Sequence, residues 1–147
     1  MNCRIVTAAD IPWIMDVGRR RYPHSYDEST MWGWIANEVL RHPHVYLALR
    51  TDDAFLLARI QGLPWIIGPV VEVLFVCAEE GAVWQAARLL RASKRWAEQR
   101  GASWRISSYT DFDLEPLALR LGARKVTAIY EIEWRPAWAQ EQDSSGH

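Results

Sequence analysis

The stretch VVEVLFVCAEEGAVWQAARLL, Val70 to Leu90, contains a strand, a short turn and the start of a helix in direct succession. Residues 70–76 are apolar at every position but one, which is typical of a strand covered on both faces. From Gly81 to Arg100 the apolar residues recur at helical spacing. Such a strand-to-helix turn directs free backbone amides and the positive end of a helix dipole toward one point. The sequence therefore raises the question of whether this turn binds a phosphate.

The elements on either side of this stretch predict an α/β (α+β) fold with a mixed, mostly antiparallel sheet and helices on both faces. The strand, helix and strand of residues 70–109 form a right-handed crossover with parallel strands, and a hairpin precedes them. We expect strands at 3–7, 45–50, 54–61, 70–76, 104–109 and 125–134, helices at about 10–21, 27–42, 81–100 and 114–121, and a loop at 62–69.

Composition favours one globular domain. The chain has 147 residues, of which 50% are hydrophobic and 24% charged. We expect residues 1–134 to form this domain and 135–147 to be a tail. The net charge of −1 provides no broad attraction to nucleic acid or anionic membranes. The nine tryptophans are expected mainly in the core.

The two cysteines, Cys3 and Cys77, argue against a disulfide framework or a metal site and fit a reducing cytoplasm. We expect no signal peptide, because no long apolar run follows a basic start. No segment reaches the about 20 apolar residues of a membrane span.

The order of elements over residues 3–134 resembles the GCN5-related N-acetyltransferase family, and the short chain is similar to its phage-encoded members. In that family the fourth strand leads into a loop of the form R/Q-x-x-G-x-G/A, whose amides hold the pyrophosphate of acetyl-CoA. The matching segment here is AEEGAV, residues 78–83. The resemblance implies acetyl-CoA as co-substrate, bound by Phe75, Val76, Glu80, Gly81, Ala82, Val83, Trp84 and Asp111.

The matching segment departs from the family pattern at two positions, and its acids permit another interpretation. Ala78 stands at the Arg or Gln position, and Val83 stands at the second small position. Glu79 and Glu80 would place negative charge beside the phosphates. In the first turn of a helix these acids are favourable without any ligand, so the sequence leaves both interpretations open.

Glu72 and Tyr109 are the candidate catalytic residues. Burial among apolar side chains raises the pKa of an unpaired carboxyl group toward the range useful for a general base, and Glu72 lies in such a strand. By the resemblance, Glu72 also corresponds to a strand-four glutamate that serves as base in some family members. A structural ion pair is the alternative. The family's usual tyrosine acid is replaced by Ala118, which leaves Tyr109 as the nearest candidate acid. The resemblance assigns polarisation of the acyl carbonyl to the amide of Val76.

The acceptor is expected to be an amine on a small molecule or a protein. Tyr22, His24, Tyr26 and Trp65 are the candidates for the acceptor groove, by resemblance to the family's helix connection and opposite loop. The chain is expected to be a monomer or a homodimer. Two alternatives remain: a non-catalytic structural or interaction protein with this fold, and an acyltransferase that acts on a nucleobase or nucleic-acid amine.

Overall fold

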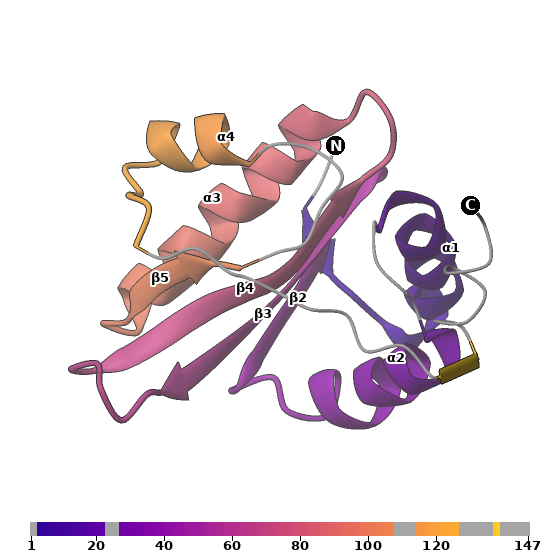
Figure 1. The fold of residues 1–147 in the computed structure, drawn as a ribbon, viewed down its shortest axis with the longest axis horizontal. Helices are drawn as coiled ribbons and strands as arrows, with labels where there is room; N and C mark the ends of the chain where they lie inside the picture. The colour runs from indigo at the N-terminus through magenta and orange to yellow at the C-terminus, as the bar shows by residue number, and fades with distance from the viewer. Residues whose placement is uncertain (1–2, 23–26, 108–113, 127–136, 139–147) are drawn as a thin grey trace.

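A mixed five-stranded sheet forms the centre of the protein (Figure 1). The computed structural model describes residues 3–22, 27–107, 114–126 and 137–138. Within these residues the strand order is β1-β2-β3-β4-β5. Consecutive strands pair antiparallel as far as β4, and β4 pairs with β5 in parallel. The strands are β1 (Arg4–Ile5), β2 (Tyr46–Arg50), β3 (Ala54–Gly62), β4 (Pro69–Ala78) and β5 (Ser103–Ile106).

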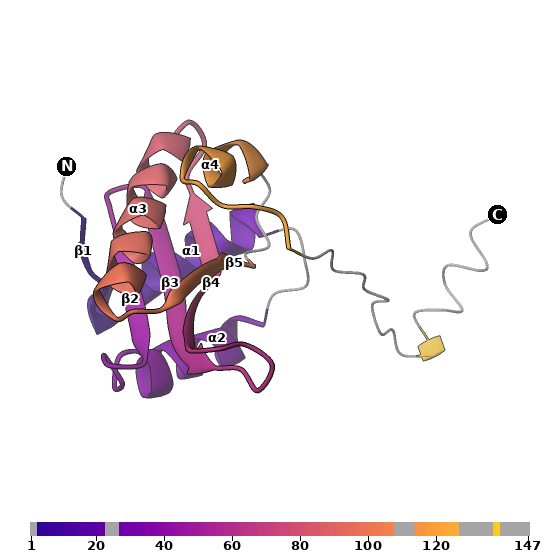
Figure 2. The same ribbon diagram turned by 90° about the vertical axis from the view of Figure 1, so that its left-hand side faces the viewer.

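Helices cover both faces of this sheet, as expected for the α/β fold. Helices α1 (Ile11–Arg21) and α2 (Glu28–Trp34) lie on one face. Helices α3 (Val83–Gln99) and α4 (Glu115–Arg120) lie on the other, which faces the viewer in Figure 2. The long helix α3 connects the parallel strands β4 and β5.

Two apolar clusters fill the space between sheet and helices. One joins the α3 side chains Ala86, Leu89 and Leu90 to Val71, Val73 and Val76 of β4. The other joins Ile11, Ile14 and Val17 of α1 to the opposite sheet face. The β4 strand therefore lies between the two cores and contributes side chains to both. Its burial holds the turn that follows it in a fixed position.

A β-bulge interrupts β4 at Leu74. Leu57 of β3 pairs with Phe75, whereas the next residue, Ala58, pairs with Val73, so Leu74 has no partner in β3. A bulge of this kind adds one residue, increases the local twist and changes which side chains share a face. As a result, Val73 and Val76 contribute to the same core although they are three residues apart.

Asp10 joins β1, β2 and the start of α1. Its carboxylate accepts hydrogen bonds from Arg4 at 2.6 and 2.7 Å, from Arg50 at 3.0 Å and from the amide of Thr7 at 2.8 Å. The side chain of Asp10 is 7% exposed. The hydrogen bonds from Arg4, and to a lesser extent those from Thr7 and Arg50, hold the pKa of Asp10 well below its ordinary value. Asp10 is therefore ionised in the folded protein at neutral pH.

Most predicted elements are confirmed within the described residues, with differences at their ends. The expected loop at 62–69 is shorter, because Gly62 belongs to β3 and Pro69 to β4. The second helix changes to a π-helical turn at Ile35–Val39. The predicted strand 125–134 lies outside the described residues except for its first two, which form no strand. The expectation for the tryptophans is confirmed only in part: Trp13, Trp34, Trp96 and Trp104 are partly buried and pack against the cores, whereas Trp32, Trp65, Trp84 and Trp138 are exposed.

Candidate functional site

A left-handed glycine and a backbone hydrogen bond shape the turn between β4 and α3. Gly81 has a φ of 80°, a left-handed conformation that favours glycine. The amide of Ala82 donates to the carbonyl of Glu79 at 3.0 Å. Helix α3 starts only at Val83, so Glu79 and Glu80 precede the helix. The interpretation of these acids as first-turn residues is therefore wrong, because the left-handed Gly81 delays the helix start.

Several amides of this turn are available to a ligand. Among the described residues, no acceptor takes a hydrogen bond from the amides of Glu80, Gly81, Val83 or Trp84. A Cβ built on Gly81 would meet no heavy atom within 4 Å, and Val83 and Trp84 are about half exposed. The first amides of a helix lack internal partners and favour an anion. The turn therefore fits a phosphate, although the exposed Glu80 carboxylate lies in the same turn.

Glu79 is neutralised by an arginine of α1. Arg20 donates to its two carboxylate oxygens at 2.7 and 2.8 Å, and also to Asp16 at 2.9 Å. The hydrogen bond from Arg20 lowers the pKa of Glu79, and the two carboxylates raise the pKa of Arg20. The expected negative charge at the turn is thus reduced by a cation that comes from the opposite face of the sheet.

A buried glutamine fixes the start of α3 on the β2–β3 hairpin. The side-chain oxygen of Gln85 accepts from the hydroxyl of Thr51 at 2.6 Å and from the amide of Asp53 at 2.9 Å. Its side-chain nitrogen donates to the Asp53 carboxylate at 3.0 Å. The amide of Glu79 also donates to the carbonyl of Asp53, at 2.7 Å. These bonds attach both the β4–α3 turn and the start of α3 to the β2–β3 hairpin.

Glu72 lies between two arginines on the sheet surface. In the strand register it is opposite Arg59 of β3 and Arg105 of β5. The Arg105 guanidinium is 3.9 Å from the Glu72 carboxylate, whose side chain is 19% exposed. Glu72 comes two residues before the bulge at Leu74. Its carboxylate is thus partly shielded from water and near a cation, without a hydrogen bond to that cation.

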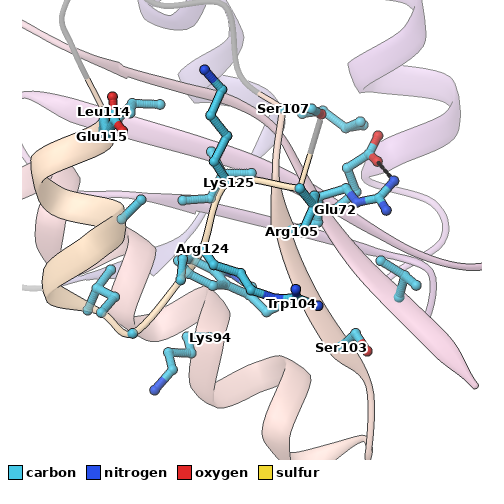
Figure 3. Close-up of a pocket in the computed structure, with 18 of the residues that line it drawn as sticks. Glu72, Lys94, Ser103, Trp104, Arg105, Ser107, Leu114, Glu115, Arg124 and Lys125 are labelled. Carbon is cyan, nitrogen blue, oxygen red and sulfur yellow. Dashed lines mark ion pairs between the residues drawn. The ribbon is translucent and has the colours of Figure 1, made fainter. Parts of the chain in front are cut away.

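Glu72 and Arg105 line a groove in which their side chains point toward one another (Figure 3). The groove has a volume of about 1260 Å³ and is bordered by β4, β5 and α4. This volume exceeds the about 300–1,000 Å³ of most ligand sites. The residues of the turn, 79–84, are outside its lining. The candidate site therefore consists of two parts joined by β4: the groove beside Glu72 and the turn at Gly81.

Aromatic rings form one wall of the groove. Phe75 lies 5.5 Å from Tyr22 and 6.2 Å from Trp34, measured between ring centroids. All three are half-buried and line the groove with Glu72. Tyr22 directly follows α1, and Trp34 is the last residue of α2 before the π-helical turn, so two separate helices contribute to this wall. These rings give the groove an apolar surface beside Glu72.

The structure brings together part of the predicted site. Glu72, Phe75 and Tyr22 share the groove; Trp65 is 76% exposed, and its neighbour Ile66 lines the groove instead. Val76 is buried beneath α3, where its side chain belongs to the core. His24, Tyr26, Tyr109 and Asp111 lie outside the described residues.

Sequence reasoning missed Trp34, Gln85 and Arg105, and it missed the pairing of Arg20 with Glu79. Each acts through a partner distant in the sequence: Gln85 contacts Thr51, and Arg20 contacts Glu79. The alternation of strand β5 could have indicated that Arg105 shares a sheet face with Glu72, once the two strands were known to be parallel neighbours.

Neither a metal-binding cluster nor a membrane-spanning helix occurs among the described residues. Ranges 3–22, 27–107 and 114–126 contain no group of three His, Cys, Asp or Glu side chains arranged to hold a metal ion. In the same part of the chain, no helix combines the length and hydropathy needed to cross a membrane.

Comparison with solved structures identifies the fold. An aminoglycoside 6'-N-acetyltransferase from Acinetobacter haemolyticus is 16% identical, with a TM-score of 0.69 over 92% of this chain and 99% of that one. A predicted acetyltransferase from Clostridium acetobutylicum, solved with acetyl-CoA, is 12% identical, with a TM-score of 0.66 over 90% and 95%. A ribosomal-protein-alanine N-acetyltransferase from Brucella melitensis is 13% identical, with a TM-score of 0.63 over 90% and 98%.

No protein-family model and no curated protein matches the sequence. At 12–16% identity the likeness to these three structures establishes the fold, and it extends over nearly the whole length of each chain. The mixed sheet, the parallel β4–β5 pair around α3 and the helices on both faces agree with the resemblance seen in the sequence. The chain has the fold of the GCN5-related N-acetyltransferases.

Proposed function

We propose that the protein is an acetyl-CoA-dependent N-acetyltransferase. The observation that carries this proposal is the arrangement along β4, where one strand bears Glu72, the bulge at Leu74 and the open turn at Gly81. The groove lies beside the middle of the strand and the turn lies at its end. Phe75 lies three residues before the end of β4 at Ala78, or about 10 Å of extended chain, and the turn with Gly81 follows directly. A long, linear acyl carrier would span this distance with its phosphates at the turn.

The turn would hold the pyrophosphate. The amides of Gly81, Val83 and Trp84 would donate to phosphate oxygens, and the dipole of α3 would favour the negative charge. Pairing with Arg20 reduces the repulsion from Glu79. The glycine fits this role because a left-handed residue in a turn is typical of the backbone concavities that bind anions.

Bound acetyl-CoA supplies an acetyl group activated as a thioester. The groove would orient an amine beside Glu72, and its aromatic wall would exclude water. Glu72 would accept the proton that the amine loses as its nitrogen forms the amide bond and the carbon–sulfur bond breaks. The assignments of Tyr109 as acid and of the Val76 amide as the group that polarises the carbonyl stay predictions from the resemblance.

The non-catalytic alternative has one observation in its favour. Ala118 of α4 lines the groove with a methyl group where the resemblance implies a tyrosine acid. A protein that binds acetyl-CoA without acid catalysis would protonate the departing thiolate from water and transfer the acetyl group slowly. Binding and turnover are therefore separate questions, and the assays must measure both.

The proposed setting is the cytoplasm, since Cys3 and Cys77 are not joined by a disulfide, and the proposed partner is an amine on a small molecule or a protein. Isothermal titration calorimetry with acetyl-CoA tests the binding part of the proposal, with ADP as the control for the nucleotide end. A Kd in the micromolar range would support it. Absence of heat at millimolar acetyl-CoA would reject it in favour of a protein that keeps the fold without the co-substrate.

A further inference from the structure

Arg105 is a partly exposed cation of the groove. Its side chain is 30% exposed and lines the groove, where Figure 3 shows it beside Glu72. Its contact with Glu72, at 3.9 Å, is an ion pair longer than a hydrogen bond. Over the described part of the chain, no acceptor takes a hydrogen bond from its guanidinium. A planar guanidinium presents five donors and binds carboxylate or phosphate in a bidentate manner.

Other cations of the groove add to the positive charge of Arg105. Arg124 and Lys125 also line the groove, and neither forms an ion pair with another described residue. Lys94, the fourth cation of the lining, pairs with Glu98 of its own helix at 3.3 Å. Against these four cations the described lining contains two carboxylates, Glu72 and Glu115. The groove thus has a positive balance beside the candidate base, which disfavours acceptors that carry several ammonium groups.

We propose that the acceptor is an amine that also carries an acidic group, and that Arg105 binds this group while Glu72 receives the amine. This inference rests on the proposed acetyl transfer and specifies its substrate class. An amino acid presents an ammonium and a carboxylate on neighbouring atoms, which matches the adjacent opposite charges of Glu72 and Arg105. The aromatic wall of Tyr22, Trp34 and Phe75 would contact the apolar part of such a molecule.

Amines that differ only in the acidic group test this assignment. Phenylalanine and phenethylamine form one pair, and O-phosphoethanolamine and ethanolamine form another, so that the two pairs distinguish a carboxylate from a phosphate. Release of the CoA thiol is measured for each amine. The protein is expected to use an acidic member at least tenfold better, in kcat/KM, than its neutral partner. The pair that shows the preference identifies the anion.

Variants then assign the preference to Arg105. Arg105→Gln should lower kcat/KM for the acidic amine, mainly through KM, at least tenfold more than it lowers kcat/KM for the neutral amine. Arg105→Lys should restore part of the loss, because it keeps the charge without the fork. Arg59→Gln is the matched control: Arg59 is the other register neighbour of Glu72, but it bonds to Gln61 and is not part of the groove lining.

Three results would overturn the inference. They are equal use or preference of the neutral amines, a preference that survives in Arg105→Gln, and failure of all acidic amines with a protein that binds acetyl-CoA. The last result would leave the proposed co-substrate intact. If acetyl-CoA itself does not bind in calorimetry, both proposals fail together.

Discussion

Arg20, in the last turn of α1, donates two hydrogen bonds to Glu79 in the turn before α3. The pair joins the two faces of the sheet at the proposed phosphate site. Glu79 and Glu80 would otherwise both oppose an anion, so the contribution of Arg20 can be measured through acetyl-CoA affinity.

Arg20→Gln should weaken acetyl-CoA binding about three- to tenfold, which corresponds to the energy of an exposed ion pair near a charged ligand. Glu79→Gln should leave the affinity unchanged or improve it, because it removes a carboxylate and leaves Arg20 in place. The double variant should bind better than Arg20→Gln alone. Equal affinities for the wild type and Arg20→Gln in calorimetry would show that the pair has no electrostatic role at the site.

Gly81 and Gly101 allow a matched test of the turn. Both have positive φ angles, 80° and 60°, and a Cβ on either would meet no atom within 4 Å. Alanine at either position should therefore cost about 1–2 kcal/mol of stability through backbone strain alone. Gly81→Ala should also lower acetyl-CoA affinity, whereas Gly101→Ala, at the far end of α3, should not. Parallel losses of affinity in both variants would mean that strain, and not the turn, affects binding.

The sequence was sufficient for the elements whose signals are local. The hairpin of β2 and β3 and the long helix α3 follow from alternation, helical periodicity and the stop at Gly101. The bulge at Leu74 could not be predicted, because it depends on how β4 aligns with β3. The π-helical turn at Ile35–Val39 had no local signal either.

The candidate site was predictable only in part for the same reason. Glu72 and Gly81 stand out because a charge in an apolar strand and a glycine before a helix are visible in the sequence. Arg20 and Arg105 belong to the site through contacts with Glu79 and Glu72. These partners are 59 and 33 positions away in the sequence, so no pattern of neighbouring residues reveals them. The acids at 79 and 80 were misplaced because the left-handed Gly81 moves the helix start to Val83.

The depressed pKa of Asp10 predicts that the folded protein loses stability in acid. Its pKa is depressed in the folded state, so its contribution to stability is full above its ordinary value of 3.8 and is lost as the pH falls below it. Asp10→Asn should destabilise the protein by about 2–3 kcal/mol at pH 7, since it removes charge-assisted bonds to Arg4 and Arg50.

Urea unfolding of the wild type and Asp10→Asn from pH 7 to pH 3 measures this difference. The gap between their free energies of unfolding should narrow below about pH 4, where the wild-type carboxylate begins to lose its advantage. Asp52→Asn, at an exposed position in the nearby hairpin turn, should have little effect. A gap that stays constant with pH would contradict the assignment.

An apolar residue at position 85 should lower the stability of the protein, although the position is buried. Gln85→Leu leaves the hydroxyl of Thr51 and the amide of Asp53 without their shared acceptor, at a cost of about 2 kcal/mol. Gln99→Leu, on the exposed end of the same helix, should cost less than about 0.5 kcal/mol. Urea denaturation measures both, and similar losses in the two variants would contradict a structural role for the Gln85 bonds.

Glu72→Gln separates catalysis from binding. Removal of the proposed base should lower kcat about 100-fold or more, with unchanged affinity for acetyl-CoA, because the proposed phosphate site lies at the other end of β4. Thiol release with a saturating amine and calorimetry measure the two quantities. Undiminished kcat would remove Glu72 from the mechanism.

The central claim is that the β4–α3 turn holds the phosphates of acetyl-CoA. Amide chemical-shift mapping of the ¹⁵N-labelled protein during a titration with acetyl-CoA tests it most directly. The account predicts the largest shifts at the amides of Glu80, Gly81, Val83 and Trp84, with smaller shifts at groove residues such as Phe75. Shifts confined to other surfaces, or none at millimolar acetyl-CoA, would contradict it.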